Sequence, residues 1–251
     1  MSERETLRIA AVADIHVKKT SQGTLQPLFS KVTEDADVLL LCGDLTDYGT
    51  IEETKILAKE ITSALRIPAI GVLGNHDFES GLEKDVASIL TDAGVVMLDG
   101  DSHEVHGVGF AGVKGFAGGF GRRALGAWGE KIIKDFVHET INEALKLEAA
   151  LARLRTPQKV AVLHYSPIQA TVGGEPPEIV AFLGSSRLEE PLDRYRVNAV
   201  FHGHAHRGSP EGRTKNGAPV YNVAMPVLAA SFPDQPPFRV IEILLTAEAV
   251  A

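Results

Sequence analysis

Five short segments of the chain carry the side chains that could do chemistry. Each brings aspartate, asparagine or histidine directly after an apolar run, and together they contain Asp14 and His16, Asp44 and Asp47, Asn75, His76 and Asp77, His164, and His204 and His206. Imidazoles mixed with oxygen ligands suit zinc, manganese, iron, cobalt or nickel better than magnesium or calcium. The spacing in Asp14-x-His16 and His204-x-His206 places two side chains on one face of extended backbone. The set therefore predicts a transition-metal site.

Each segment taken alone has a simpler explanation. The Gly-Asp-x-x-Asp segment at residues 43–47 could be a turn followed by a helix cap, and Gly-Asn-His-Asp at 74–77 could be a tight turn. The pair His204 and His206 could be part of a structural zinc site. All five segments nevertheless occur together, each after an apolar run, which favours one common site over separate turns.

The apolar runs before these segments predict the strands that position them. Runs at residues 7–13, 38–44, 69–73, 160–163 and 199–201 suit strands covered on both faces. Helical patterns at 25–35, after Thr50 and at 81–92 alternate with the first strands, which indicates a mainly parallel sheet. Thr50 with Glu53 resembles a capping box. Ligands bind at the carboxyl ends of strands in such sheets, and glycines at 43, 74 and 203 allow close approach there.

The rest of the chain predicts further elements without an obvious domain boundary. Strands are expected at 95–98, 104–113, 220–224 and 238–245, and the segments 114–129 and 166–178 read as long surface loops. The longest helical pattern, 129–155, has an apolar face that would pack on the sheet or form a homodimer contact; it comprises Ile133, Phe136, Val137, Ile141, Leu145 and Leu151. We therefore expect a single domain over residues 1–251.

Composition and charge narrow the class of protein. A net charge of −8 and a pI near 5.6 argue against nucleic acid and anionic membranes as partners. The polar N-terminus lacks a signal region, and no run approaches the roughly 18 apolar residues of a membrane span. The single cysteine, Cys42, lies in an apolar run and is expected to be buried. These features predict a soluble, cytoplasmic protein.

As a set, the five segments resemble the motifs of the calcineurin-like metallophosphoesterase superfamily. The resemblance covers residues 8–206 and implies an α/β fold, a four-layer α/β/β/α sandwich of two mixed sheets flanked by helices. It also implies two divalent transition-metal ions, with manganese, iron and zinc as the candidates. One ion would be held by Asp14, His16, Asp44 and His206. The other would be held by Asp44, Asn75, His164 and His204, so that Asp44 bridges the two.

The resemblance assigns roles to the neighbouring residues as well. His76 would be a catalytic histidine that holds no metal, Asp77 the acid that orients it, and Asp47 a residue that supports the ligands. A water between two ions loses its proton near neutral pH and can attack phosphorus. Protonated His76 could then donate to the leaving oxygen. His202 is expected to be structural, and the remaining histidines are expected to be solvated: His103, His106 and His138.

The substrate is expected to be a small phosphodiester. The segment Gly-Asn-His-Asp-Phe at 74–78 lacks the arginine-led form associated with phosphoprotein phosphatases and looks closer to the phosphodiesterase branch. A phosphomonoesterase or nuclease with the same centre, or a non-catalytic scaffold, are the alternatives. Candidate phosphate contacts are Arg122, Arg123 and Arg207.

Overall fold

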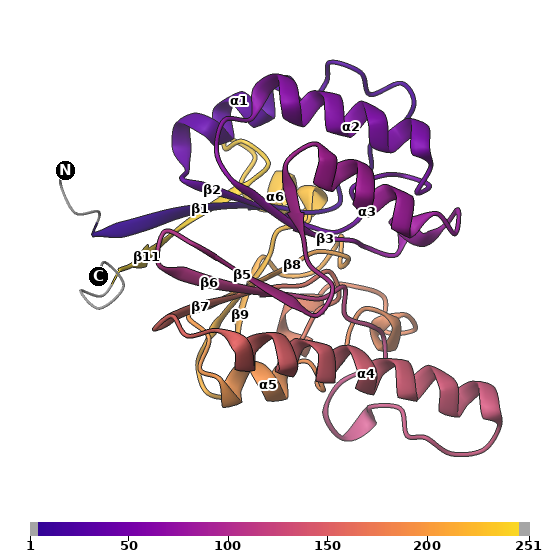
Figure 1. The fold of residues 1–251 in the computed structure, drawn as a ribbon. Helices are drawn as coiled ribbons and strands as arrows, with labels where there is room; N and C mark the ends of the chain where they lie inside the picture. The colour runs from indigo at the N-terminus through magenta and orange to yellow at the C-terminus, as the bar shows by residue number, and fades with distance from the viewer. Residues whose placement is uncertain (1–4, 246–251) are drawn as a thin grey trace.

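The first of two facing sheets carries helices on its outer side (Figure 1). In the computed structural model, which describes residues 5–245, its strand order is β11-β1-β2-β3-β4. The strands are β1 (Thr6–Val12), β2 (Val38–Cys42), β3 (Ala69–Val72), β4 (Val95–Met97) and β11 (Arg239–Leu244). Only the β1–β11 pair is antiparallel. The covering helices are α1 (Gln26–Asp35), α2 (Ile51–Ala64) and α3 (Glu83–Asp92).

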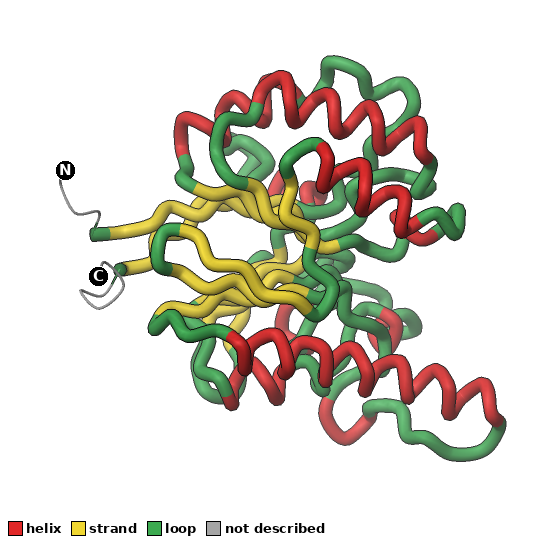
Figure 2. Tube along the Cα trace, in the orientation of Figure 1, coloured by secondary structure: helices red, strands yellow, loops and turns green. Residues whose placement is uncertain are grey.

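The second sheet has the order β5-β6-β7-β8-β10-β9 and is also mixed (Figure 2). Its strands are β5 (Asp101–Val105), β6 (Val108–Gly112), β7 (Gln158–Val162), β8 (Ala199–His202), β9 (Glu211–Arg213) and β10 (Pro219–Asn222). Helices α4 (Lys131–Arg153) and α5 (Glu189–Arg194) lie on its outer side, and α6 (Met225–Ser231) follows β10. The predicted α/β fold, with two mixed sheets between layers of helices, is confirmed.

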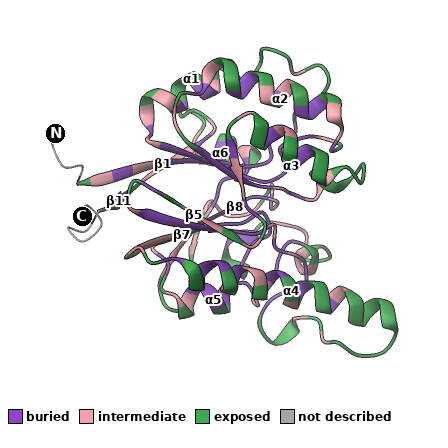
Figure 3. Cartoon of the chain, in the orientation of Figure 1, coloured by how far each residue is buried: buried purple, intermediate pink, exposed green. Residues whose placement is uncertain are grey.

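Apolar side chains from both sheets form the central core. One cluster joins Val38 and Leu40 of the first sheet to Phe110, Val162 and Phe201 of the second. All five residues of β2 are buried, as its uninterrupted apolar sequence predicts (Figure 3). Burying each large side chain contributes about 1.5–3 kcal/mol. The strands whose ends carry the candidate ligands are therefore anchored on both faces.

The local predictions for α2 and Cys42 are confirmed. The Thr50 hydroxyl accepts a hydrogen bond from the Glu53 backbone N–H, and the Glu53 carboxylate accepts one from the Thr50 backbone N–H, which completes the capping box. Cys42 is buried with a free thiol. The capping box fixes where α2 begins, and so how the chain leaves the end of β2.

The expected strand at 104–113 is only partly correct. Residues 108–112 form β6, but Glu104 and Val105 belong to β5, which pairs with β6 in an antiparallel hairpin. The chain turns at His106 and Gly107, whose φ angles of 51° and 80° are the positive values that a two-residue type I′ turn needs. Val105 and Val108 on either side of the turn gave the impression of a continuous strand.

The expected apolar face of α4 is partly wrong. Leu145 and Ile133 are 57% and 39% exposed, whereas Val137 and Leu151 are buried as expected. The packed side instead includes Thr140, Glu143, Leu147 and Ala150. Two of these residues are polar and form hydrogen bonds with the backbone beneath the helix. A prediction from apolar residues alone therefore gives the wrong packed face. The short elements β9, α5 and α6 were not predicted.

Some predictions concern the chain ends. Residues 1–4 of the polar N-terminus lie outside the described residues, and so do residues 246–251, so a single domain over 1–251 stays a prediction. Within residues 5–245, no helix has the length and hydropathy needed to span a bilayer.

Candidate metal centre

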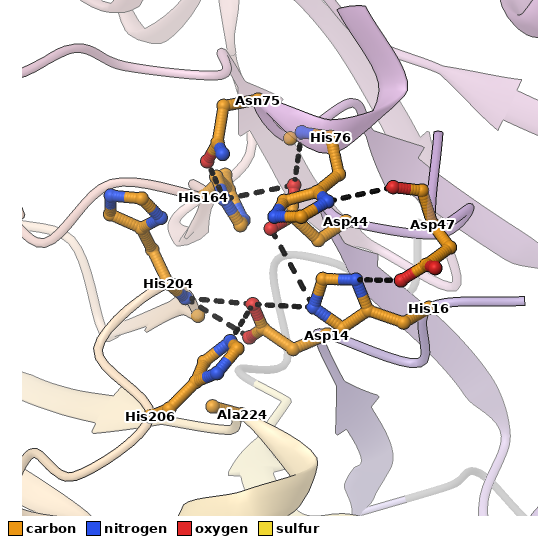
Figure 4. Close-up of polar contacts among 12 residues, drawn as sticks. Asp14, His16, Asp44, Asp47, Asn75, His76, His164, His204, His206 and Ala224 are labelled. Atoms are coloured by element: carbon orange, nitrogen blue, oxygen red, sulfur yellow. Dashed lines mark hydrogen bonds and ion pairs between the residues drawn. The ribbon is translucent and has the colours of Figure 1, made fainter. Parts of the chain in front are cut away.

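The candidate ligands lie together at the carboxyl ends of parallel strands from both sheets (Figure 4). Segments after β1, β2 and β3 supply Asp14, His16, Asp44 and Asn75, and segments after β7 and β8 supply His164, His204 and His206. Ligand atoms of Asp14, His16, Asp44 and His206 all lie within 4.8 Å of one another, and so do those of Asp44, His164 and His204. Asp44 belongs to both groups.

The two aspartates that anchor these groups are buried and held by backbone donors. Asp44 Oδ1 accepts from the His76 N–H at 2.9 Å, and Asp14 Oδ2 accepts from the His204 N–H at 3.0 Å. Their φ angles of 49° for Asp44 and 57° for Asp14 lie in the left-handed region that non-glycine residues rarely adopt. Strain of this kind is concentrated at functional sites. The fold thus forces both carboxylates toward the shared space.

His16 gives the test of whether a metal ion suits the first group. Both of its ring nitrogens are buried, and neither has a hydrogen-bond partner among residues 5–245. Its Nε2 lies 3.8 Å from Asp44 Oδ2 and 4.0 Å from Asp14 Oδ1. These distances are too long for hydrogen bonds, but the three atoms surround a space that one cation could occupy. Leaving a buried polar atom unsatisfied costs about 1–3 kcal/mol. A cation among these atoms would remove that cost, so the donor set fits a divalent transition metal.

His164 organises the second group. Its Nδ1 lies 3.0 Å from the Cys42 carbonyl oxygen, and its Nε2 lies 3.0 Å from Asn75 Oδ1 and 3.3 Å from Asp44 Oδ1. A backbone carbonyl that binds one imidazole nitrogen commonly fixes a metal-ligating histidine. Nε2 is therefore the atom turned toward the centre, and the Asn75 oxygen lies beside it as a further candidate ligand.

The His164 and Asp44 side chains form a buried ion pair. Burial alone would lower the pKa of His164, but the Asp44 carboxylate raises it to about 9. Burial would likewise raise the pKa of Asp44, and the His164 charge reverses this and lowers it. A cation that binds Asp44 and His164 would take the place of this proton, since the imidazole must be neutral to be a ligand.

Three glycines leave room for the ligand side chains. A Cβ on Gly74 would lie 2.2 Å from Asp44 Oδ1, one on Gly203 would lie 2.3 Å from Asp14 Oδ2, and one on Gly43 would lie 2.4 Å from His164 Nδ1. These separations are shorter than any real contact of a Cβ. The close approach expected at these glycines is therefore an approach by the ligand side chains.

His76 lies at the edge of the centre, and Asp47 lies beside it. The His76 and His16 ring centroids are 4.5 Å apart in an edge-on arrangement. His76 Nδ1 lies 2.7 Å from the Asp47 carbonyl oxygen, so a proton on Nδ1 leaves Nε2 as the second reactive nitrogen. The Asp47 carboxylate lies 3.5 Å from His16 Nδ1.

Asp77 makes contacts that differ from the expectation. Its fully buried carboxylate accepts hydrogen bonds from the backbone N–H groups of Leu45, Thr46 and Gly74 and from the Thr46 hydroxyl. Burial raises the pKa of Asp77, although these bonds oppose the rise. The group that contacts His76 Nδ1 is the Asp47 carbonyl. Asp77 instead joins the turn after β2 to the turn after β3.

The three candidate arginines are exposed. Arg122 and Arg123 lie in the 3₁₀ turn η2 (Gly121–Arg123), within the loop that precedes α4. Arg207 follows His206, and its backbone N–H donates to Glu175. Among the described residues, none of the three guanidinium groups has a hydrogen bond or ion pair with a candidate ligand. Their role in binding phosphate stays a prediction.

Several residues around the centre were not predicted as part of it. The ring centroid of Tyr165 lies 4.3 Å from that of His204, and the Phe182 carbonyl oxygen lies 3.2 Å from His204 Nε2. The sequence signal for Tyr165 is its position directly after His164. Phe182 has no such signal. His202 is structural in its contacts, with Nε2 2.8 Å from Thr171 Oγ1, and burial lowers its pKa to about 4.

Comparisons with known proteins agree with this geometry. The model of the calcineurin-like phosphoesterase family matches residues 7–208. A protein of Vesicomyosocius okutanii subsp. Calyptogena okutanii (strain HA), named "Probable cyclic nucleotide phosphodiesterase", is 23% identical over 213 residues, which span 79% of this chain and 78% of that protein. The structure of phosphopantetheinyl hydrolase (PptH) from Mycobacterium tuberculosis has a TM-score of 0.66 at 15% identity and covers 93% of this chain and 95% of its own. The structural similarity indicates a shared fold.

Proposed function

Because the chain belongs to the calcineurin-like phosphoesterase family, we propose that it hydrolyses a small phosphodiester at a centre of two divalent metal ions. The observation that supports this most directly is that Asp44 belongs to two groups of ligand atoms. The first ion would be held by Asp14, His16, Asp44 and His206. The second would be held by Asp44, Asn75, His164 and His204.

Different residues of the chain would have different roles in this reaction. When bound, the ions would supply Lewis-acid chemistry, activating water and neutralising phosphoryl oxygens. Asp14 and Asp44 hold the cations in place with buried negative charge. His76 stands beside the centre with Nδ1 bound to a carbonyl, so its Nε2 is the atom that would pass a proton to the leaving oxygen. General acid catalysis of this kind contributes about 10²–10⁴-fold.

Two observations support a diester over a monoester or a nucleic acid. A diester carries one negative charge and needs fewer cationic contacts. Among the described residues, the candidate arginine side chains make no hydrogen bond or ion pair with a candidate ligand. The net charge of −8 disfavours a polyanion. The name of the Vesicomyosocius okutanii relative points to a phosphodiesterase as well.

A two-substrate assay tests the proposal. The purified protein, supplied with Mn²⁺, Fe²⁺ or Zn²⁺ in turn, is given bis-p-nitrophenyl phosphate and p-nitrophenyl phosphate. We expect a higher kcat/KM for the diester, and no hydrolysis by an Asp44→Ala control prepared in parallel. A strong preference for the monoester contradicts the diester assignment. If neither ester is hydrolysed with any of the metals, the proposal that the protein is a hydrolase is contradicted.

A further inference from the structure

A cavity of about 310 Å³ is lined by residues on either side of the segment 74–77, and no candidate metal ligand is among its lining residues. Its apolar lining comes from the ends of β3 and β4, from the 3₁₀ turn between β3 and α3, and from α3. It includes Leu73, Phe78, Ala87, Met97 and Leu98. Lys114, which follows β6, lies on its other side. Binding sites for small molecules are concave, mostly apolar and about 300–1,000 Å³ in volume. The cavity matches this description at the lower end of the range.

The cavity borders the side of the centre where His76 lies. Phe78 belongs to the same 3₁₀ turn as His76, η1 (His76–Phe78). Leu73 immediately precedes Gly74 and Asn75. The Lys114 carbonyl oxygen accepts from the His164 N–H at 3.0 Å. Three lining residues are therefore joined by backbone to the segments that carry candidate ligands and the candidate acid.

The ammonium group of Lys114 has an unusual environment. It lies 5.4, 4.9 and 5.2 Å from the ring centroids of Phe78, Phe116 and Tyr165. One N–H donates to the Gly115 carbonyl, and within residues 5–245 no carboxylate lies at ion-pair distance. Burial lowers the pKa of this lysine. The rings hold the cation by cation–π attraction, and its remaining N–H groups stay available for an acceptor on a ligand.

The other charges that line the cavity are of both signs and largely offset one another. Glu83 and Lys84, at the start of α3, carry opposite charges. Asp99 pairs with Lys146 at 2.9 Å, and Asp101 lies 3.6 Å from Arg153. Ligand recognition in the cavity would therefore depend on its apolar surface and on the Lys114 ammonium. A flat apolar group with an acceptor atom can cover the apolar surface and accept a hydrogen bond from Lys114. A small polar alcohol such as glycerol would leave the apolar surface exposed to water.

We propose that this cavity binds the leaving alcohol of the substrate and selects a flat aromatic alcohol that bears a hydrogen-bond acceptor. Phe78 packs against the ring and Lys114 donates to the acceptor, so these two residues determine specificity and hold no metal. The assignment to the leaving alcohol rests on the proposed hydrolytic function, because the cavity lies on the side of His76, the residue expected to protonate that alcohol.

Methionine NMR tests binding in the cavity without relying on catalysis. The chain has three methionines, of which Met97 lines the cavity and Met225 lies outside it. Protein labelled with ¹³C at the methionine methyl groups and stripped of metal is titrated with 4-nitrophenol, and a Met97→Leu variant assigns the signal. We expect the ring to shift the Met97 methyl signal while Met225 stays in place. Cyclohexanol, which has neither an aromatic ring nor a nitro group, should leave Met97 unshifted.

Matched variants identify the residues responsible. Phe78→Ala and Lys114→Met should each weaken 4-nitrophenol binding about tenfold, which corresponds to about 1.4 kcal/mol. Tyr48→Ala and Lys19→Met, exposed residues outside the cavity, should bind as the parent chain does. The proposal is overturned by an unshifted Met97, by an equal shift with cyclohexanol, or by parental affinity in both cavity variants.

Kinetics separate this inference from the proposed function. With bis-p-nitrophenyl phosphate, Phe78→Ala should raise KM about tenfold and leave kcat within about twofold. Hydrolysis without a Met97 shift overturns the cavity assignment and leaves the hydrolase standing. A Met97 shift without hydrolysis of any ester supports the cavity and contradicts the hydrolase.

Discussion

The two sheets supply different chemistry to the candidate metal centre. The first-sheet side, formed by the segments after β1, β2 and β3, provides every carboxylate and the amide oxygen: Asp14, Asp44, Asp47 and Asn75. The second-sheet side, formed by the segments after β7 and β8, provides only imidazoles: His164, His204 and His206. Negative charge therefore enters the centre from one sheet alone.

The two sides are also held differently. On the first-sheet side, the three candidate ligands Asp14, His16 and Asp44 adopt positive φ angles of 57°, 42° and 49°. On the second-sheet side, His204 adopts one of 68°. The second-sheet side is supported by a buried network around His202, whose Nε2 contacts Thr171 Oγ1, which in turn contacts Ser166 Oγ, both at 2.8 Å. Both acids therefore lie on strained backbone, and the second-sheet side has a buried hydrogen-bond network as additional support.

Contacts between the two sides indicate what a cation would replace. His206 Nε2 lies 2.9 Å from Asp14 Oδ1, and His164 Nε2 lies 3.3 Å from Asp44 Oδ1. Asp14 and Asp44, the two buried acids of the proposed ligand sets, thus each face a histidine of the second-sheet side. In the proposed centre the acids would attract the cations, whereas each histidine would complete the coordination of one ion. Substitutions on the two sides should consequently differ in how much metal they release.

The largest effect is expected for Asp44→Ala. Removing the carboxylate common to both groups should release both ions and abolish hydrolysis, whereas His204→Ala should release one ion and retain the other. Metal content per folded chain, measured by elemental analysis after gel filtration, distinguishes the two. If Asp44→Ala retains two ions, Asp44 is not a ligand shared by both ions. The two sheet sides would then not differ in how much metal their variants release.

A smaller loss is expected for His76→Ala. His76 lies on the first-sheet side but outside the proposed ligand sets, so kcat should fall about 10²–10⁴-fold while metal content stays unchanged. Steady-state kinetics with bis-p-nitrophenyl phosphate, alongside elemental analysis of the same sample, measure both quantities. An unchanged kcat with full metal content would remove His76 from the reaction.

Asp77→Asn should affect stability more than chemistry. An amide nitrogen would face backbone N–H donors that now bind the Asp77 carboxylate, and leaving a buried donor unsatisfied costs about 1–3 kcal/mol. Urea unfolding should show this decrease in the free energy of unfolding. The control Asp92→Asn, at the exposed end of α3, should unfold as the parent chain does. A stable variant with the catalytic defect of His76→Ala would instead favour the expected orienting role for Asp77.

The smallest effect is expected for Thr171→Val on the second-sheet side. The change removes the hydroxyl that contacts His202 and Ser166 and should lower the free energy of unfolding by about 1–2 kcal/mol. Metal content should remain complete, with Thr62→Val on the exposed face of α2 as the control. Loss of an ion from Thr171→Val would mean that the network determines coordination as well as stability.

The strands and ligand candidates could be predicted because their signals are local. The apolar sequence of residues 38–42 indicates a strand buried on both faces, and a polar residue directly after such a strand must emerge at the sheet edge. The hairpin at His106 and Gly107 was missed because apolar residues flank the turn on both sides. The Leu145 error arose because buried Thr140 and Glu143 bond to the chain under α4.

Other features of the site depend on tertiary contacts that leave no local signal. The partner of His76 is the Asp47 carbonyl, and every residue has a carbonyl. Lys114 became notable only when the fold placed three rings around its ammonium group. A homodimer, a cytoplasmic location, and the roles of Arg122, Arg123 and Arg207 stay predictions, because they depend on partners or ligands outside a single chain.

The central claim is that Asp44 joins two metal ions held between the sheets. Crystals of the protein grown with Mn²⁺, with anomalous diffraction recorded at the manganese edge, test it most directly. We predict two anomalous peaks per chain, one beside Asp14, His16 and His206 and one beside Asn75, His164 and His204, with Asp44 in contact with both. A single peak, or two peaks of which only one contacts Asp44, would contradict the account.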